Sequence, residues 1–179
     1  MSNYRDQLEN YLKSLNIKAD TVLDVGGKEL PIKDRVNGWK VKNYSILDLP
    51  EYNLNVKNQD YYMEADIVFC LEVMEYIWNP NIALENLYDL LKDDGILYIT
   101  FQFLYPIHEP NQFDYLRFTK EGSCRLLQNA EFEIKQIIPR VMKPESYDLW
   151  RKFLTIESMH SSKFVDHSEL GWIFKAKKL

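Results

Sequence analysis

Short apolar runs alternate with segments of helical spacing along the whole chain. Apolar runs bounded by turn residues are typical of strands, and continuous ones are typical of strands buried in a parallel sheet. The pattern predicts seven strands, which are Thr21–Val25, Tyr44–Leu47, a minor strand at Val56, Ala65–Leu71, Ile96–Phe103, Phe132–Ile138 and Gly171–Lys178.

Between these runs, apolar residues recur at the spacing of an amphipathic helix. The predicted helices are Asn3–Leu15, a short segment from Pro31 to about Val36, Pro80–Lys92, a helix capped by Thr119 that runs through Ala130, and Pro144–His160. Gly38 should end the short segment. Strands that alternate with helices predict an α/β domain with a largely parallel sheet and helices on both faces.

The composition is that of a soluble globular protein. The chain has 179 residues, which favours one domain over residues 1–179, and 46% of them are apolar. A net charge of -5 disfavours broad binding to nucleic acid phosphates. Cys70 and Cys124 lack metal-ligand spacing and are expected to be reduced thiols of a cytoplasmic protein. The N-terminus is polar and no apolar run is long, so neither a signal peptide nor membrane insertion is expected.

The stretch Thr21–Gly27, T-V-L-D-V-G-G, ends a strand-like run with two glycines. Glycines at a strand end permit a tight turn and the close approach of a ligand to the main chain. Asp24 is costly inside an apolar strand unless it is paired or hydrogen-bonded. It either braces the glycine turn, binds a cationic group of a ligand, or belongs to a strand end that runs into a turn.

Asp48 follows Asp24 by 24 positions and closes the second predicted strand. An acidic residue here is the ribose-binding arrangement of nucleotide folds, because its carboxylate accepts hydrogen bonds from two vicinal hydroxyls. The alternative is a turn or helix-capping aspartate ahead of Pro50. Parallel strands should place Gly26, Asp48 and Leu71 on one rim of the sheet.

Four motifs, in this order, resemble those of class I S-adenosylmethionine-dependent methyltransferases of the type 11 kind. They are V-L-D-V-G at 22–26, S-I-L-D-L at 45–49, A-D-I-V-F-C-L-E-V-M-E-Y-I at 65–77 and L-L-K-D-D-G-I-L-Y-I-T at 90–100. The final run, G-W-I-F-K-A-K-K, is similar to the antiparallel closing strand of that family. The resemblance implies a Rossmann-like sheet of seven strands with an antiparallel last strand.

The resemblance also implies a site for S-adenosyl-L-methionine. The Gly26–Gly27 main chain would pass the methionyl part, and Asp24 would support that turn or the amino group. Asp48 would hold the ribose, and Leu49 would pack on the adenine. The strand end Cys70–Leu71 would line the methionyl side.

Departures from the family pattern lie in and after the glycine turn. The usual G-x-G-x-G has Lys28 and Leu30 at its later glycine positions, and Tyr76 stands where many members carry His. The adenine-contacting residue after the third strand has no clear counterpart, although Asn58, Gln59 and Asp60 are candidates.

The loop 103–119 follows the fifth strand and is expected to form the acceptor side. His108 is the candidate general base, since the pKa of histidine lies near neutral pH. Tyr105 and Tyr115 offer flat apolar surface with a polar tip, and Arg117 would bind an acidic group of the acceptor. The alternative is that Arg117 pairs with Asp114 or a helix end.

These features predict an enzyme that methylates a small molecule on oxygen or nitrogen. The alternative is a methyltransferase-like scaffold that has lost catalysis, which the reduced glycine motif favours. An NAD-dependent dehydrogenase is disfavoured because Lys28 and Pro31 occupy the later positions of its G-x-G-x-x-G. His160 and His167 lack partners at ligand spacing, so no metal is expected. A homodimer is left open.

Overall fold

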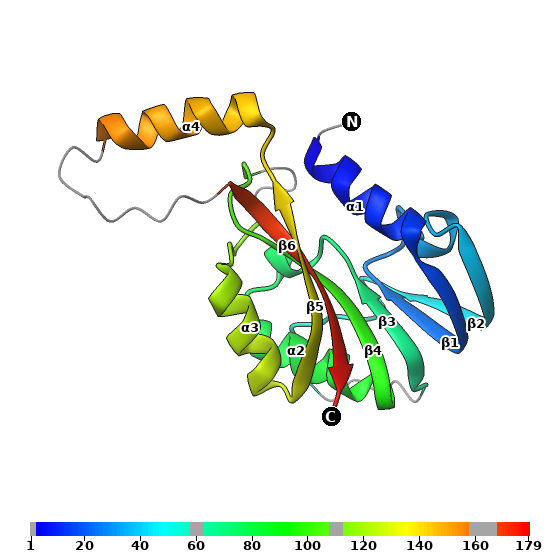
Figure 1. Cartoon of the computed structure of the whole chain (residues 1–179). Helices are drawn as coiled ribbons and strands as arrows, with labels where there is room; N and C mark the ends of the chain where they lie inside the picture. The colour runs from blue at the N-terminus through cyan, green and yellow to red at the C-terminus, as the bar shows by residue number, and fades with distance from the viewer. Residues whose placement is uncertain (1–2, 58–62, 108–112, 158–167) are drawn as a thin grey trace.

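One six-stranded sheet forms the centre of the computed structural model, which describes residues 3–57, 63–107, 113–157 and 168–179 (Figure 1). The strands are β1 (Asn16–Val25), β2 (Gly38–Leu47), β3 (Ala65–Cys70), β4 (Leu91–Gln102), β5 (Phe132–Val141) and β6 (Glu169–Lys178). They lie in the order β2-β1-β3-β4-β6-β5. The strands β1 to β4 run parallel to one another, whereas β6 runs antiparallel to β4 and β5. The α/β class and the antiparallel last strand are therefore confirmed.

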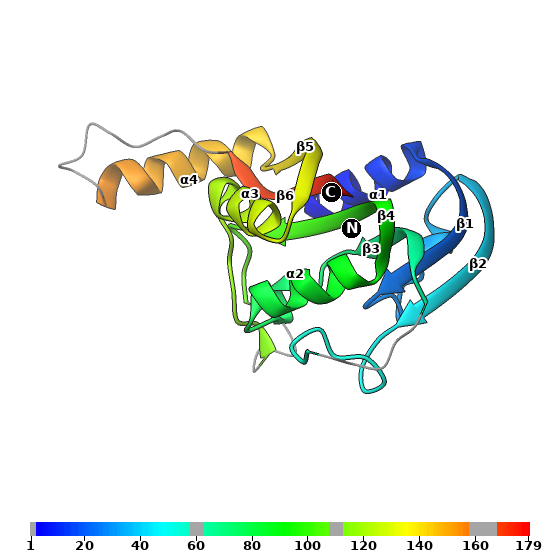
Figure 2. The ribbon, with the colours of Figure 1, turned by 90° about the horizontal axis from the view of Figure 1, so that it is seen from below.

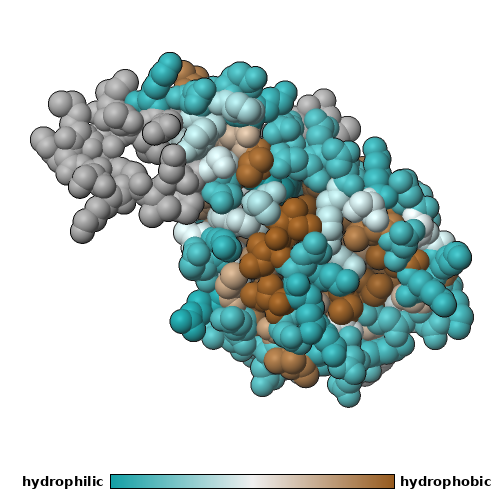
Figure 3. Space-filling model, viewed as in Figure 1, coloured by the Kyte–Doolittle hydropathy of each residue, from teal (hydrophilic) through white to brown (hydrophobic). Residues whose placement is uncertain are grey.

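Helices cover both faces of the sheet, as predicted (Figure 2). The helical segments are α1 (Asn3–Ser14), α2 (Pro80–Asp89), α3 (Lys120–Asn129), α4 (Pro144–Glu157) and the short 3-10 helices η1 (Ile32–Asp34) and η2 (Met74–Tyr76). α2 and α3 lie on one face, and α1 with η1 lies on the other. α1 covers only part of its face, and apolar surface remains visible over β5 and β6 (Figure 3).

The side chains of β3 alternate between the two cores. Val68 belongs to the core beneath α2, whereas Phe69 packs in the core that holds Leu8 and Leu12 of α1. Both leucines are fully buried, and burial of such a side chain contributes about 1.5–3 kcal/mol. These contacts fix α1 against the face of the sheet opposite α2.

The predicted strand at Val56 is wrong, and the sheet has six strands rather than seven. Val56 lies in a turn, where its N–H donates to the Asn53 carbonyl at 3.0 Å. The side chains of Tyr52 and Leu54 are buried in the core beneath α2. The amide of Asn86 donates to the carbonyls of Leu54 and Val56 at 3.0 and 2.8 Å. A side chain of α2 thus satisfies backbone groups that a strand would have paired, and β2 is left at the sheet edge.

Several predicted boundaries differ from the structure, among them the starts of β1, at Asn16 instead of Thr21, and of β4, at Leu91 instead of Ile96. Gly38 begins β2 instead of ending a helix, because β2 pairs along its whole length with β1, starting at Asn16. A Cβ at Gly38 would lie 2.1 Å from the Asn16 Oδ1 atom, so any larger residue would displace the Asn16 side chain. α2 ends at Asp89, before its predicted end, because Leu91 already pairs with Ala65 in the sheet.

Side chains cap the two helices beneath the sheet. The Asn79 side chain accepts from the Ile82 N–H at 3.3 Å at the start of α2. Thr119 Oγ1 accepts from the Gly122 N–H at 3.1 Å, so the predicted Thr119 cap is confirmed. Such caps are worth about 1 kcal/mol each. Among the helices of the described ranges, none is long and apolar enough to cross a membrane.

Candidate active site

The carboxyl ends of β2, β1 and β3 meet at one edge of the sheet. Val25 is in register with Leu47 on one side and with Cys70 on the other. Gly26, Asp48 and Leu71 each come one residue later. They therefore lie next to one another at the ends of the three strands, as the sequence predicts. Ligands of open α/β sheets bind outside these strand ends.

The glycine turn is held from both sides of the main chain. Gly26 has φ +79°, a conformation that favours glycine, and its N–H donates to the Leu47 carbonyl at 2.8 Å. A Cβ at Gly26 would lie 2.4 Å from Val73 Cγ2, and one at Gly27 would lie 2.1 Å from Asp24 Oδ2. Both positions therefore favour glycine for packing, and Gly26 does so for its backbone conformation as well.

Asp24 braces this turn from inside the protein. Its side chain is buried, and Oδ2 accepts hydrogen bonds from the Ile32 N–H at 2.7 Å and the Tyr44 hydroxyl at 2.6 Å. Burial raises the pKa of Asp24 above its ordinary value, and the bonds from Tyr44 and Ile32 oppose that rise. These contacts join β1 to β2 and to η1, and they match the bracing alternative. Contact of Asp24 with a ligand stays a prediction.

Asp48 has a different environment at the end of β2. The side chain is partly exposed; Oδ2 accepts from the Lys28 N–H at 3.1 Å and Oδ1 from the Leu49 N–H at 2.8 Å. Each carboxylate oxygen can accept a further hydrogen bond. Lys28, which departs from the glycine pattern, thus ties the turn to Asp48 through its main chain. Leu49 is 58% exposed beside it.

Cys70 and Leu71 contribute main chain rather than side chain to this edge. Both side chains are buried, and they point into opposite cores because residues of a strand alternate. Burial raises the pKa of the Cys70 thiol far above its ordinary value, so the thiol is inert. Their assignment to the cofactor site stays a prediction that concerns backbone groups.

Arg117, predicted to bind the acceptor, is bonded within its own loop. Its guanidinium forms two hydrogen bonds with the carboxylate of Asp114, whose side chain is fully buried. It also donates to the carbonyls of Tyr105 at 3.1 Å and Pro106 at 3.3 Å. This geometry matches the alternative of an Asp114 pair, and acceptor binding by Arg117 stays a prediction. His108 lies outside the described residues.

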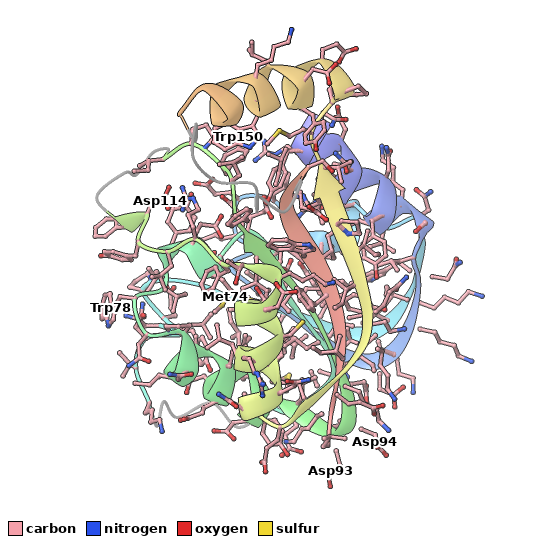
Figure 4. All side chains as sticks on the ribbon, turned by 60° about the vertical axis from the view of Figure 1, so that its left-hand side comes forward. Met74, Trp78, Asp93, Asp94, Asp114 and Trp150 are labelled. Carbon is pink, nitrogen blue, oxygen red and sulfur yellow. The ribbon has the colours of Figure 1, made fainter. Side chains whose placement is uncertain are left out.

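The two tyrosines of this loop lie in different surroundings. The ring of Tyr105 contacts that of Tyr4 of α1, with centroids 4.9 Å apart. Tyr115 is 42% exposed and meets Trp78 edge-on at 5.9 Å, on the side of the molecule where Figure 4 labels Trp78. Tyr115 therefore offers aromatic surface at the sheet edge, whereas Tyr105 fixes the loop to α1.

The structure adds a buried ion pair that the sequence analysis missed. Arg140 of β5 is fully buried and donates to the carboxylate of Glu72 at 2.5 and 3.2 Å. It also donates to the Tyr4 carbonyl at 3.1 and 3.0 Å and lies over the Tyr4 ring. Glu72 has φ 57°, and its N–H donates to Thr100 Oγ1 at 2.7 Å. This pair anchors α1 and β5 to the end of β3.

Glu75 and Gln102 form a second buried polar pair that was missed. Gln102 Nε2 donates to Glu75 Oε1 at 2.5 Å. Burial, and next the charge of Glu72, raises the pKa of Glu75 to about 8. The signal in the sequence was the pair of glutamates within E-V-M-E at 72–75, directly after a buried strand, together with Gln102 at the end of the next one.

One family model matches almost the entire chain. It is described as a methyltransferase domain and covers residues 2–177. Among curated proteins, the ubiquinone biosynthesis O-methyltransferase of Glaesserella parasuis serovar 5 is 24% identical, over 48% of this chain and 43% of that protein. The chain therefore spans less than half the length of that relative.

Two solved structures illustrate the shared fold. A putative S-adenosylmethionine-dependent methyltransferase from Listeria monocytogenes superposes with a TM-score of 0.64 at 13% identity, covering 99% of this chain and 98% of that one. The N-methyltransferase NodS from Bradyrhizobium japonicum WM9, in complex with S-adenosyl-L-homocysteine, gives 0.63 at 9% identity, covering 98% and 87%. At these identities the likeness is one of fold.

Proposed function

Because the chain belongs to the methyltransferase-domain family, we propose that it transfers a methyl group from S-adenosyl-L-methionine to oxygen or nitrogen of a small-molecule acceptor. The observation that carries the proposal is the rim at which Gly26 and Asp48 follow side by side on β1 and β2. A glycine turn next to an acidic strand end is what a nucleoside cofactor requires.

The residues at this rim fit the proposed cofactor. Asp48 keeps acceptor capacity on both oxygens for two vicinal hydroxyls, after bonding the N–H groups of Lys28 and Leu49. Leu49 presents exposed apolar surface for a flat base. We assign the methionyl part to the main chain of the Gly26 turn, which Asp24 supports from within. The N–H of Lys28 anchors the turn to Asp48, so the reduced glycine motif is compatible with a closed, ordered loop.

The chemistry asks little of the protein beyond positioning. S-adenosylmethionine supplies an electrophilic methyl group on a sulfonium, which is a good leaving group. The protein must hold donor and acceptor in line and exclude water. A general base is needed only where the acceptor keeps a proton at the moment of attack. We assign that role to His108, as the sequence predicts.

The acceptor side is the loop 103–119 together with η2. Tyr115 with Trp78 offers exposed aromatic surface next to the strand ends. Arg117 and Tyr105 shape the loop through the bond between the guanidinium and the Tyr105 carbonyl. These features suit a small acceptor that is partly flat.

Calorimetric titration with S-adenosylmethionine and S-adenosylhomocysteine tests this function. We expect binding of both with a dissociation constant of about 1 μM, equivalent to roughly -8 kcal/mol. Absence of binding up to roughly 1 mM would refute the enzyme and leave the scaffold alternative. A folded protein, checked by its circular dichroism, is the condition for either conclusion.

A further inference from the structure

Glu75 is a buried carboxyl group with an incomplete set of partners. It lies in η2 with 0% of its surface exposed, and Gln102 of β4 is 2% exposed. Gln102 Nε2 donates to Glu75 Oε1 at 2.5 Å. The remaining oxygens, Glu75 Oε2 and Gln102 Oε1, are buried and have no hydrogen-bond partner among the described residues. Two buried acceptors without a donor lower the stability of the folded protein. The loss is greater when one of them belongs to a charged carboxylate.

A single proton on Glu75 would give both of these oxygens a hydrogen-bond partner. A protonated carboxylic acid offers a donor and an acceptor side by side, as does a primary amide. Once the amide N–H bonds Oε1, a proton on Oε2 can donate to Gln102 Oε1 and close a ring of two hydrogen bonds. We infer that Glu75 is protonated in the folded protein, pairs with Gln102 as acid with amide, and through this pair positions the segment 115–118 of the acceptor side.

The charged groups around Glu75 favour the protonated form. Burial is the largest influence, followed by the negative charge of Glu72, and Asp114 acts in the same direction. Arg117 opposes them, but its guanidinium is bonded to Asp114, and Arg140 is bonded to Glu72 and to a main-chain carbonyl. The neighbouring Cys70 and Tyr76 carry no charge at neutral pH, since the pKa of each is raised.

A bound metal ion explains the two unpaired oxygens less well than a proton does. Glu72 is the nearest further carboxylate in sequence, and it already forms a salt bridge with Arg140. Across the ranges that the structure describes, no group of three or more His, Cys, Asp or Glu side chains is arranged to hold a metal ion. A proton needs only the two groups that are present.

The same two residues hold the acceptor segment through their main chains. The Glu75 carbonyl accepts from the N–H groups of Tyr115 at 2.8 Å and Leu116 at 3.2 Å, and the Gln102 carbonyl accepts from Phe118 at 2.7 Å. The side-chain pair therefore locks two carbonyls at a fixed separation, and segment 115–118 spans them. Glu75 acts as a positioning residue, and this assignment rests on the proposed function of that segment.

The first test replaces Glu75 with its amide. In Glu75→Gln the new amide can make both hydrogen bonds to Gln102 without a titrating proton. The folded pKa of Glu75 is raised from 4.5 to about 8, so its contribution to stability is full below 4.5 and is lost as pH rises toward 8. Relative to Glu75→Gln, the wild-type unfolding constant should rise roughly tenfold per pH unit across this window and then level off.

Denaturant unfolding from pH 5 to pH 9 measures this difference. Glu64→Gln, which removes an exposed carboxylate just before β3, is the control and should follow the wild-type profile. Infrared spectra at pH 6 should also show a protonated-carboxyl band that Glu75→Gln lacks. The inference is overturned if the wild-type and Glu75→Gln profiles run parallel and no such band is lost.

The second test addresses positioning. In hydrogen exchange followed by NMR, Glu75→Ala should speed exchange of the Tyr115, Leu116 and Phe118 amides about tenfold, the equivalent of one hydrogen bond, relative to amides of β1. Glu75→Gln should restore the wild-type rates. Equal rates at these three amides in all variants would contradict the positioning role. Titration of the wild type with S-adenosylhomocysteine tests the proposed function by itself. A negative titration would therefore count against that function and not against the Glu75–Gln102 pair.

Discussion

Asp24 and Glu75 are both buried carboxyl groups beside the same edge of the sheet, but the protein surrounds them differently. Asp24 receives two donors on one oxygen, from Ile32 and Tyr44. Glu75 receives one side-chain donor, from Gln102, and its Oε2 atom has no hydrogen-bond partner among the described residues. We therefore propose different charge states for the two groups, a carboxylate with donors at Asp24 and a neutral acid at Glu75. Burial raises the pKa of both groups, and the two donors at Asp24 oppose that rise.

The two sides also differ in how they hold their loops. On the cofactor side, short main-chain contacts hold the Gly26–Gly27 turn against β2. On the acceptor side the ties are side-chain pairs: Asp114 with Arg117 inside the loop, and Glu72 with Arg140 between the end of β3 and β5. We therefore expect mutations on the acceptor side to reduce stability with little effect on cofactor affinity, and mutations on the cofactor side to reduce both.

The largest effect is expected at Arg140. Arg140→Ala removes a fully buried guanidinium and leaves Glu72 and the Tyr4 carbonyl without it. Loss of one member of a buried pair lowers the free energy of unfolding by about 3–5 kcal/mol. Urea denaturation measures it, with Arg125→Ala on the exposed face of α3 as control. A loss no greater than that of the control would show that the pair adds nothing to stability.

Arg117→Ala is the next largest. It removes the bidentate bond to the buried carboxylate of Asp114 and the hydrogen bonds to the carbonyls of Tyr105 and Pro106. We expect the free energy of unfolding to fall by about 1.5–3 kcal/mol, the range for hydrogen bonds to charged groups. Titration of the folded variant with S-adenosylhomocysteine should give the wild-type affinity. A stable variant that loses that affinity would move Arg117 to the cofactor side.

Gly27→Ala probes the cofactor side. The added methyl would lie 2.1 Å from the Asp24 carboxylate, which must shift and weaken its bonds to Ile32 and Tyr44. Overpacking of this kind reduces stability by about 1–3 kcal/mol. S-adenosylhomocysteine affinity should fall as well, measured by calorimetry. Gly122→Ala, whose Cβ would meet only Thr119 Oγ1 at 3.1 Å, is the control. Unchanged affinity would separate the turn from the site.

The sequence predicted the placement of Gly26 and Asp48 better than the contacts around the loop 103–119, and the reason is physical. Gly26 and Asp48 are set by local signals, a glycine turn and an acidic strand end, and their neighbourhood follows from parallel pairing. The pair of Glu72 with Arg140 joins residues 68 positions apart, and a side chain on a late strand gives no local sign of its partner. The strand predicted at Val56 is absent because the Asn86 amide, 30 positions away in the sequence, donates to the carbonyl of Val56.

The central claim is that Asp48 at the end of β2 holds the ribose of the cofactor. Calorimetric titration of Asp48→Ala with S-adenosylhomocysteine tests it directly, with Asp93→Ala as control, since Figure 4 shows Asp93 at the far end of the sheet. We predict that Asp48→Ala weakens binding by about 1.5–3 kcal/mol, roughly 10- to 150-fold, while Asp93→Ala changes nothing. Equal affinities of the two folded variants and the wild type would contradict the account.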